Sequence, residues 1–204
     1  MTRVLVVCAH PDDEAVGCGG TLRLHALDGD RIITVFLTSG ERGGHGEEDH
    51  ARTREREARR AAAILGIEAL QFWHEADGRL RAGGRLVRRL TKLIDSLRPA
   101  RVYVPHARDD HPDHRAAARL VRLAVVAAAT PPLVRGFEIW SPLSAIEEVV
   151  DISSVLPDKR RAIRAYRSQC AVMDLDHASV GLARYRGEMH SWPGGPYAEV
   201  FSRG

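Results

Sequence analysis

The sequence predicts an α/β fold of the Rossmann-like type, a three-layer sandwich with helices on both faces of a mainly parallel sheet. Short apolar runs such as residues 4–9 are typical of strands that are buried on both faces. Segments with apolar residues at helical spacing lie between these runs. Strand-like and helix-like segments alternate as far as residue 129, a pattern that predicts parallel strands joined by right-handed crossovers.

The individual elements follow from the same two patterns. Short apolar runs predict strands at residues 3–9, 32–37, 69–73 and 102–104. Helical spacing of apolar residues predicts helices at residues 21–27, 51–65, 86–97 and 116–129. Each helix is followed by a stop signal. Gly29 and Gly66 follow the first two helices, and Pro99 and the pair Pro131–Pro132 follow the others.

The pattern changes in the last third of the chain. Residues 137–140 and 147–152 are predicted to form two further strands. Ser153 is a candidate N-cap for a helix that continues through Lys159 to about Tyr166. The tail is rich in Gly and Pro and ends in the segment 197–201, Tyr-Ala-Glu-Val-Phe. Because neither a repeat nor a linker is visible, we expect one domain over residues 1–204.

Composition and charge narrow the class of protein. A hydrophobic fraction of 44% and a charged fraction of 28% are typical of a globular protein. The net charge is only +3, the positive residues are spread along the chain, and aromatic residues make up 5%. We therefore expect no nucleic-acid partner, which would need a dense basic face with stacking aromatics.

The sequence also indicates the cellular compartment in which the protein is expected. No apolar stretch is long enough to cross a bilayer, and the N-terminus leads directly into a strand, so we expect neither a membrane partner nor a signal peptide. The three cysteines form no disulfide framework, which predicts a reducing cytoplasm. Cys8 lies within the first strand, where a small core residue is favoured over a metal ligand.

Two clusters of His and Asp residues follow predicted strands. Residues 10–14 (His-Pro-Asp-Asp-Glu) come after the first strand, and residues 109–114 (Asp-Asp-His-Pro-Asp-His) come after the fourth. In a doubly wound sheet of order 3-2-1-4-5 plus C-terminal strands, strands one and four are neighbours, and ligands bind beyond their carboxyl ends. The following side chains are therefore expected to face one another across one crevice: His10, Asp12, Asp13, His111 and His114.

These residue types point to metal chemistry. An imidazole beside three carboxylates is electrostatically unfavourable unless a cation lies among them. Two imidazoles and one carboxylate with an open fourth position form a familiar catalytic zinc arrangement. Zinc in such a site lowers the pKa of bound water to about 7 and polarises a carbonyl, while a second carboxylate can move the proton. Adjacent Asp12 and Asp13 cannot easily point the same way, which suits one ligand and one base for amide hydrolysis.

Simpler explanations exist for each cluster taken alone. The acids at 12–14 could cap the next helix, and His111 and His114 could be a solvated pair. A dinucleotide loop at residues 17–20 is rejected, because the Gly-x-Gly-x-x-Gly pattern is incomplete and the preceding acids would repel a pyrophosphate. The glycine-rich segment 39–50 follows a strand end and fits either a binding or lid role or a solvated connection.

The chain resembles the PIG-L (LmbE-like) family of zinc-dependent de-N-acetylases. The two signatures of that family, Ala-His-Pro-Asp-Asp-Glu and His-Pro-Asp-His, stand at residues 9–14 and 111–114. Further similarities lie at residues 54–57, 65–66, 77–78, 151–153, 159, 168–169 and 197–201. The resemblance therefore spans nearly the whole chain in the right order.

The resemblance implies a role for each cluster residue. His10, Asp13 and His114 would hold the metal, which would be zinc or another divalent transition metal. Asp12 would be the general base. His111 would stabilise the oxyanion and serve as general acid, and Asp113 would tune or orient that histidine. Whether Asp12 alone or Asp12 with His111 handles both proton transfers stays open.

Two further positions match residues that line the sugar pocket in relatives. These are Arg54 and Asp77, for which a surface salt bridge is the alternative in each case. The resemblance implies a hydrolase that removes the N-acetyl group from an N-acetylglucosamine-type amino sugar in a larger small-molecule conjugate. Because Asp109-Asp110 stand where the mycothiol branch has an aromatic residue, a mycothiol substrate is disfavoured.

Two other functions stay open, as does the oligomeric state. The first alternative is an amidase of a non-sugar substrate such as a thiol conjugate. The second is a non-catalytic metal- or sugar-binding protein. Trp192 and the segment 197–201 would either cover the sheet or join subunits into a homo-oligomer.

Overall fold

The computed structural model describes residues 1–43 and 50–204. Within them, seven strands form one sheet in the order β3-β2-β1-β4-β5-β7-β6. The strands are β1 (Arg3–Cys8), β2 (Arg31–Thr38), β3 (Ala69–Glu75), β4 (Arg101–Pro105), β5 (Leu133–Phe137), β6 (Glu148–Asp151) and β7 (Ala198–Arg203). The first five are parallel, and β7 runs antiparallel between β5 and β6. The expected order 3-2-1-4-5 with C-terminal strands at one edge is confirmed.

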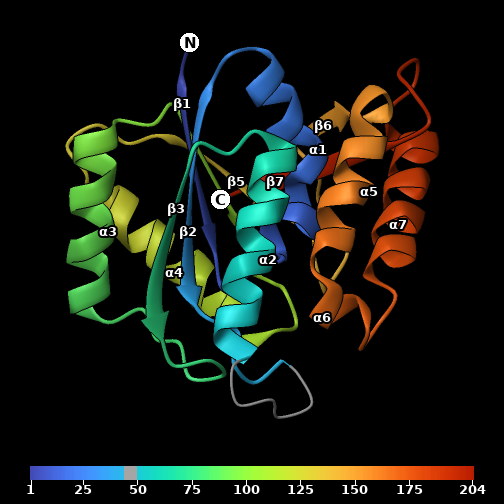
Figure 1. The fold of residues 1–204 in the computed structure, drawn as a ribbon. Helices are drawn as coiled ribbons and strands as arrows, with labels where there is room; N and C mark the ends of the chain where they lie inside the picture. Colours follow the sequence, from blue (N-terminus) through green and yellow to red (C-terminus); the bar gives the residue numbers. More distant parts are fainter. Residues whose placement is uncertain (44–49) are drawn as a thin grey trace.

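Helices cover both faces of the sheet, as Figure 1 shows. One face carries α3 (Gly84–Leu97) and α4 (Pro112–Ala127). The other carries α1 (Asp13–Leu27), α2 (His50–Leu65) and α5 (Leu156–Ala165). Beyond α5 lies α7 (Leu175–His190), which packs against β7. A short helix α6 (Arg167–Cys170) and a 3₁₀ turn η1 (Ser153–Val155) complete this end of the chain.

The alternation of side chains along β1 explains the two cores. Successive strand residues point to opposite faces of a sheet. Val4, Val6 and Cys8 therefore enter the core under α1, α2 and α5. Leu5 and Val7 enter the core under α3 and α4. Each of these side chains is fully buried, so Cys8 is a core residue.

Close packing accounts for Gly17 and Gly20. The backbone of α1 is kinked at Cys18. A Cβ atom on Gly17 would lie 2.2 Å from Phe137 Cδ2, and one on Gly20 would lie 2.7 Å from the side chain of Ile152. The glycines thus let α1 approach the sheet edge, which explains them without a dinucleotide.

Three elements near the C-terminus differ from expectation. The strand expected at 137–140 lies at Leu133–Phe137 instead, where it pairs with β4. Ser153 does not cap α5: its hydroxyl donates to the Tyr197 carbonyl and accepts from the Tyr197 amide. Helix α7 was not predicted, because Gly181 and Gly187 weaken its helical pattern and part of its apolar side lines a cavity instead of the core.

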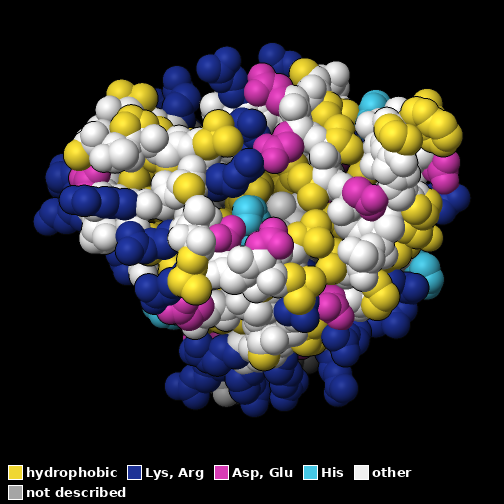
Figure 2. Space-filling model, turned by 90° about the horizontal axis from the view of Figure 1, so that it is seen from above, with side chains coloured by type: hydrophobic (Ala, Val, Ile, Leu, Met, Phe, Trp, Pro, Cys, Tyr) yellow, Lys and Arg dark blue, Asp and Glu magenta, His cyan; other side chains and the backbone are white. Residues whose placement is uncertain are grey.

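Basic side chains are dispersed over most of the surface in view in Figure 2, with one concentration over α2. The strands run downward in Figure 1, so Figure 2 views their amino ends, with Lys and Arg side chains scattered around the rim and gathered over α2. None of the described helices is long and apolar enough to span a membrane. Of the segment 39–50, for which a lid role was considered, positions 44–49 lie outside the described residues.

Candidate metal centre and catalytic cleft

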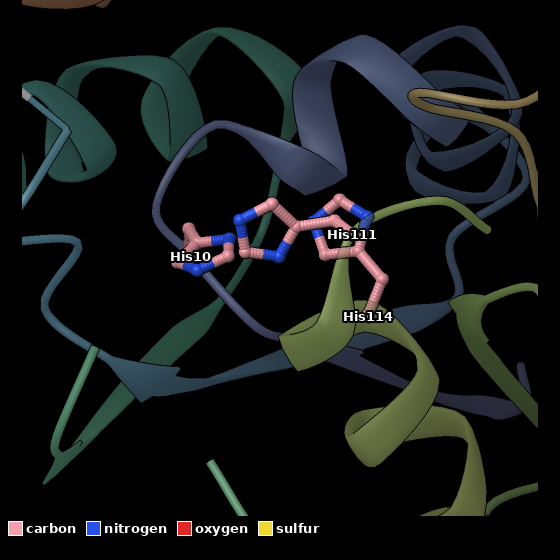
Figure 3. Close-up of side chains that lie close together, drawn as sticks. All are labelled: His10, His111 and His114. Carbon is pink, nitrogen blue, oxygen red and sulfur yellow. The ribbon is translucent and has the colours of Figure 1, made fainter. Parts of the chain in front are cut away.

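The fold brings the two His/Asp clusters together at the carboxyl ends of β1 and β4. These strands are hydrogen-bonded neighbours, and the residues after them begin α1 and α4. The ring centroids of His10 and His111 are 4.7 Å apart, those of His111 and His114 4.8 Å, and those of His10 and His114 5.3 Å. Figure 3 shows these three rings side by side.

Asp13 and His114 direct atoms that could bind a metal toward each other. Asp13 Oδ1 lies 3.2 Å from His114 Nε2 and 3.9 Å from His10 Nδ1. The other carboxylate oxygen accepts the amides of Ala9 and His10, at 2.8 and 3.0 Å. His114 Nε2 is buried and has no hydrogen-bond partner. Asp13 Oδ1 thus lies near one nitrogen of each imidazole. One carboxylate oxygen and two imidazole nitrogens are a donor set of the kind that suits a divalent transition metal.

Among the described residues, the groups of three whose ligand atoms all lie close to one another do not include Asp13. The nearest nitrogens of His10, His111 and His114 all lie within 4.8 Å of one another. Likewise, His10, Asp77 and Asp113 form a group of the same kind. These two carboxylates face His10 Nε2, at 3.1 and 3.5 Å, whereas Asp13 faces Nδ1. They are therefore placed to orient His10 from behind, as acidic partners of metal-bound imidazoles commonly do.

Asp109 supports His114 in the same way. Its Oδ1 lies 2.9 Å from His114 Nδ1, and its Oδ2 accepts the amides of Trp140 and Ser141, at 3.0 and 3.3 Å. Burial lowers the pKa of His114, but the carboxylates of Asp13 and Asp109 outweigh this effect and raise it to about 9. A divalent cation between Asp13 and His114 would replace the proton that this pairing otherwise favours.

Asp12 lines the cleft and has a different partner from Asp13. Its backbone has a φ of 128°, a left-handed conformation that is costly for a non-glycine residue. Its Oδ2 lies 2.9 Å from Arg54 Nη2. Burial raises the pKa of Asp12 to about 6, although the Arg54 guanidinium opposes the rise. A carboxylate with this pKa is suited to accept a proton near neutral pH.

His111 occupies the N-cap of α4. Its Nδ1 accepts the amide of Asp113 at 3.2 Å, which leaves the proton of the neutral ring on Nε2. Burial, together with the neighbouring His10 and His114, lowers the pKa of His111. The ring stacks on Trp140 with centroids 6.4 Å apart, and both residues line the cleft. His111 is therefore a neutral hydrogen-bond donor in the geometry described.

Asp113 reaches His111 only through its backbone amide. Its carboxylate accepts the amides of Gly78 and Leu80, at 2.7 and 3.1 Å, and lies beside His10. The side chain thus fixes the loop after β3 to the start of α4. The negative charge of Asp113 acts to raise the pKa of His111, but burial outweighs this contribution and the pKa is lowered overall.

Arg54 and Asp77 line the cleft but also contact the cluster residues directly. Arg54 is buried; besides its contact with Asp12 it donates to the carbonyls of Gly40 and Pro11. Asp77 accepts the amide of Arg42 at 2.8 Å. Burial would raise the pKa of Asp77, but the hydrogen bond to His10, the charge of that ring, the Arg42 amide and the charge of Arg54 together outweigh burial and lower the pKa to about 2. Neither residue forms a mere surface salt bridge.

The cleft encloses about 720 Å³. That volume lies within the range of about 300–1,000 Å³ that holds ligands of drug-like size. Its lining begins with the cluster residues, continues past Trp140 and Glu138, and extends to the loop before α7 and one side of that helix.

Comparison with known proteins identifies the family. Residues 5–125 match the family model described as PIG-L, GlcNAc-PI de-N-acetylase. The chain belongs to the PIG-L family. Diacetylchitobiose deacetylase of Thermococcus kodakarensis is 31% identical over 190 residues, covering 82% of this chain and 70% of the relative.

Two solved structures extend the similarity to the whole chain. The conserved protein TT1542 of Thermus thermophilus is 32% identical, with a TM-score of 0.87, and the match covers 100% of this chain and 94% of the other. GalB, the 4-carboxy-2-hydroxymuconate hydratase of Pseudomonas putida KT2440, is 27% identical, with a TM-score of 0.88, covering 99% and 95%. The PIG-L fold is thus associated with more than one named activity.

Two buried acids of this PIG-L site escaped the sequence reasoning. Asp109 contacts His114, but nothing in the sequence distinguishes it from the exposed Asp110. Glu14 accepts the hydroxyl of Tyr166 and the amide of Asp12. Burial raises the pKa of Glu14 to about 8, so it is mostly protonated at neutral pH. Its partner Tyr166 is far away in sequence, so only the fold reveals the pair.

Proposed function

We propose that this chain is a metal-dependent hydrolase that removes the N-acetyl group from an N-acetylglucosamine-type amino sugar in a larger conjugate. One observation carries the proposal: Asp12 and Asp13 are adjacent and both line the cleft, yet Asp12 pairs with Arg54 whereas Asp13 faces His10 and His114. That divergence separates a metal ligand from a proton acceptor. Relatives named as deacetylases of N-acetylated sugars support the substrate class.

His10, Asp13 and His114 would hold the metal, with zinc as the first choice. Their donor set suits zinc, and the buried, unpartnered His114 Nε2 supports the assignment. A divalent metal held there would polarise the acetyl carbonyl and lower the pKa of water to about 7. Asp77 and Asp109 would keep the two imidazoles in orientation.

The remaining chemistry falls to Asp12 and His111. Asp12 would accept a proton from the attacking water, consistent with its pKa of about 6. The Nε2–H group of His111 would donate a hydrogen bond to the oxyanion that develops on the acetyl carbonyl. The proton taken up by Asp12 would then reach the amine as the C–N bond breaks, either directly or by transfer through His111, and acetate and the free amine leave. Asp113 would hold His111 in place through its backbone amide.

Arg54 and Asp77 would border the sugar subsite while they fix Asp12 and His10.

We place the reaction in the cytoplasm, in keeping with three cysteines that remain free thiols.

The test is primary-amine release by zinc-loaded protein from a panel of N-acetylglucosamine conjugates, with Asp12→Asn as the inactive control. Release from one class of sugar that is absent in the mutant supports the proposal. Bound zinc without release from any sugar contradicts it.

A second candidate reaction is the addition of water to a carboxylated alkene, favoured by the similarity to the hydratase GalB. It would use the same metal and the same proton acceptor. Loss of the alkene absorbance of such a substrate, without amine release from any sugar, would favour it over deacetylation.

A further inference from the structure

The cleft has an apolar half that the deacetylation chemistry does not use. Helix α7 lines it with Leu175, Ala178 and Leu182, residues spaced so that they share one side of the helix. Val172 and Met173 precede the helix and line the same cleft. The polar half lies beyond the carboxyl ends of the central strands β1 and β4, whereas α7 packs against β7, the strand next to β6. In Figure 1, α7 lies beyond α5.

These apolar side chains are incompletely covered by the protein. Val172 is 46% exposed and Met173 is 42% exposed, while Leu175 and Leu182 are half-buried. Apolar surface that remains in contact with water costs free energy, which an apolar ligand group would recover on binding.

Ion pairs on other sides of α7 hold this wall in place. Near its start, Asp176 is paired with Arg160 and Arg164. Near its end, Arg186 is paired with the buried Glu138. Because both ends of the helix are anchored, its apolar side is presented to the cleft before any ligand binds, which reduces the ordering cost of binding.

Polar groups in this half bind each other instead of facing a ligand. The Nζ of Lys159 donates to Glu199 at 2.6 Å and to the Val16 carbonyl at 2.7 Å, and both charged side chains are buried. The Ser179 hydroxyl also donates to the Val16 carbonyl, at 3.1 Å. This half of the cleft therefore offers an apolar environment.

We propose that the amino-sugar substrate carries an apolar group, an alkyl chain or an aryl ring, which binds against Leu182, Met173 and Val172. This proposal rests on the proposed deacetylation, since it places the reacting amide at the metal end of the same cleft. The apolar group would enter the substrate either as the aglycone or as part of the N-acyl group.

Three glycosides test the proposal with zinc-loaded protein. They are the methyl glycoside of N-acetylglucosamine, its hexyl glycoside, and the methyl glycoside that carries N-hexanoyl in place of N-acetyl. Complete burial of one methylene raises affinity about fourfold. In a groove that is open on one side, we expect one of the hexyl compounds to exceed the methyl compound in kcat/KM by at least about tenfold.

Leu182→Asn and Met173→Asn should remove most of that gain. Val126→Asn is the matched control, because Val126 is 81% exposed on α4 and lies outside the cleft. Equal kcat/KM for all three glycosides, or a gain that both cleft variants retain, would overturn the proposal while leaving deacetylation intact. A gain limited to one hexyl compound identifies the aglycone or the acyl group as the source.

If no glycoside releases amine, the deacetylase function fails and the apolar subsite is tested by binding alone. Calorimetric titration with the hexyl and methyl glycosides then decides it. Tighter binding of the hexyl glycoside that Leu182→Asn abolishes supports the subsite, and equal binding of the two glycosides overturns it.

Discussion

Substitution of Asp109 by Asn tests whether the metal site depends on the carboxylate behind His114. Oδ1 of Asp109 accepts from His114 Nδ1 and from the His111 amide, and Oδ2 accepts from the Trp140 and Ser141 amides. An asparagine has one acceptor oxygen and one NH₂ group. The two donors that lie opposite the NH₂ group would therefore lose their acceptor.

The magnitude follows from that mismatch. Two unpaired buried donors cost about 1–3 kcal/mol each. For a chain of this size, each 1 kcal/mol lowers Tm by about 2–4 °C. We therefore expect Asp109→Asn to lower Tm by at least about 4 °C. Loss of the carboxylate behind a ligand histidine weakens metal binding by about 10–100-fold.

Zinc affinity is measured by competition with a chromophoric chelator, and Tm by thermal denaturation of the metal-free protein. Asp110→Asn is the matched control, because this neighbouring carboxylate is exposed. Wild-type zinc affinity in Asp109→Asn would refute the argument that Asp109 supports a ligand. A loss of the same size in Asp110→Asn would show that the effect is not specific to Asp109.

Three further predictions concern single residues. Asp12→Asn should retain zinc and lose about 10²–10⁴-fold in kcat; a normal turnover number would remove Asp12 as the base. His114→Ala should bind no stoichiometric zinc after dialysis, and an unchanged metal content by atomic absorption would exclude it as a ligand. Burial raises the pKa of Asp176, but Arg160 and Arg164 outweigh this and lower it. Its stabilising effect is therefore complete at neutral pH and is lost as the pH falls below about 4, the unfolded-state value, towards the lowered folded-state pKa. Asp176→Asn should accordingly lower Tm at pH 7 by more than it does at pH 3; an equal shift at both pH values would contradict the ion-pair account.

Much of the fold could be predicted because local patterns determine it. The apolar runs of β1, β2 and β4 are buried on both faces, and such runs have few alternatives to a parallel strand. Helix α7 could not be predicted, because its apolar side faces a cleft and the helix is stabilised by ion pairs with residues distant in sequence.

The site was predictable to the extent that it lies in two short motifs. The position of His10, Asp12, Asp13, His111 and His114 follows from the sheet order, which makes β1 and β4 neighbours. The contacts of individual side chains could not be predicted from the motifs. The carboxylate of Asp113 accepts the Gly78 amide of the loop after β3 and lies beside His10. The carboxylate that contacts His114 Nδ1 belongs to Asp109. Motif spacing does not distinguish these carboxylates.

The hydrogen bonds of Asp109 have a practical consequence for redesigning substrate preference. Its carboxylate joins His114 to the backbone of Trp140 and Ser141, and Glu138 of the same loop is held by Arg186 of α7. If His114 holds the metal as proposed, engineering of that loop would alter metal loading together with specificity. Leu182 and Met173 lie outside this network, so a library confined to them could vary ligand choice and leave the metal centre undisturbed.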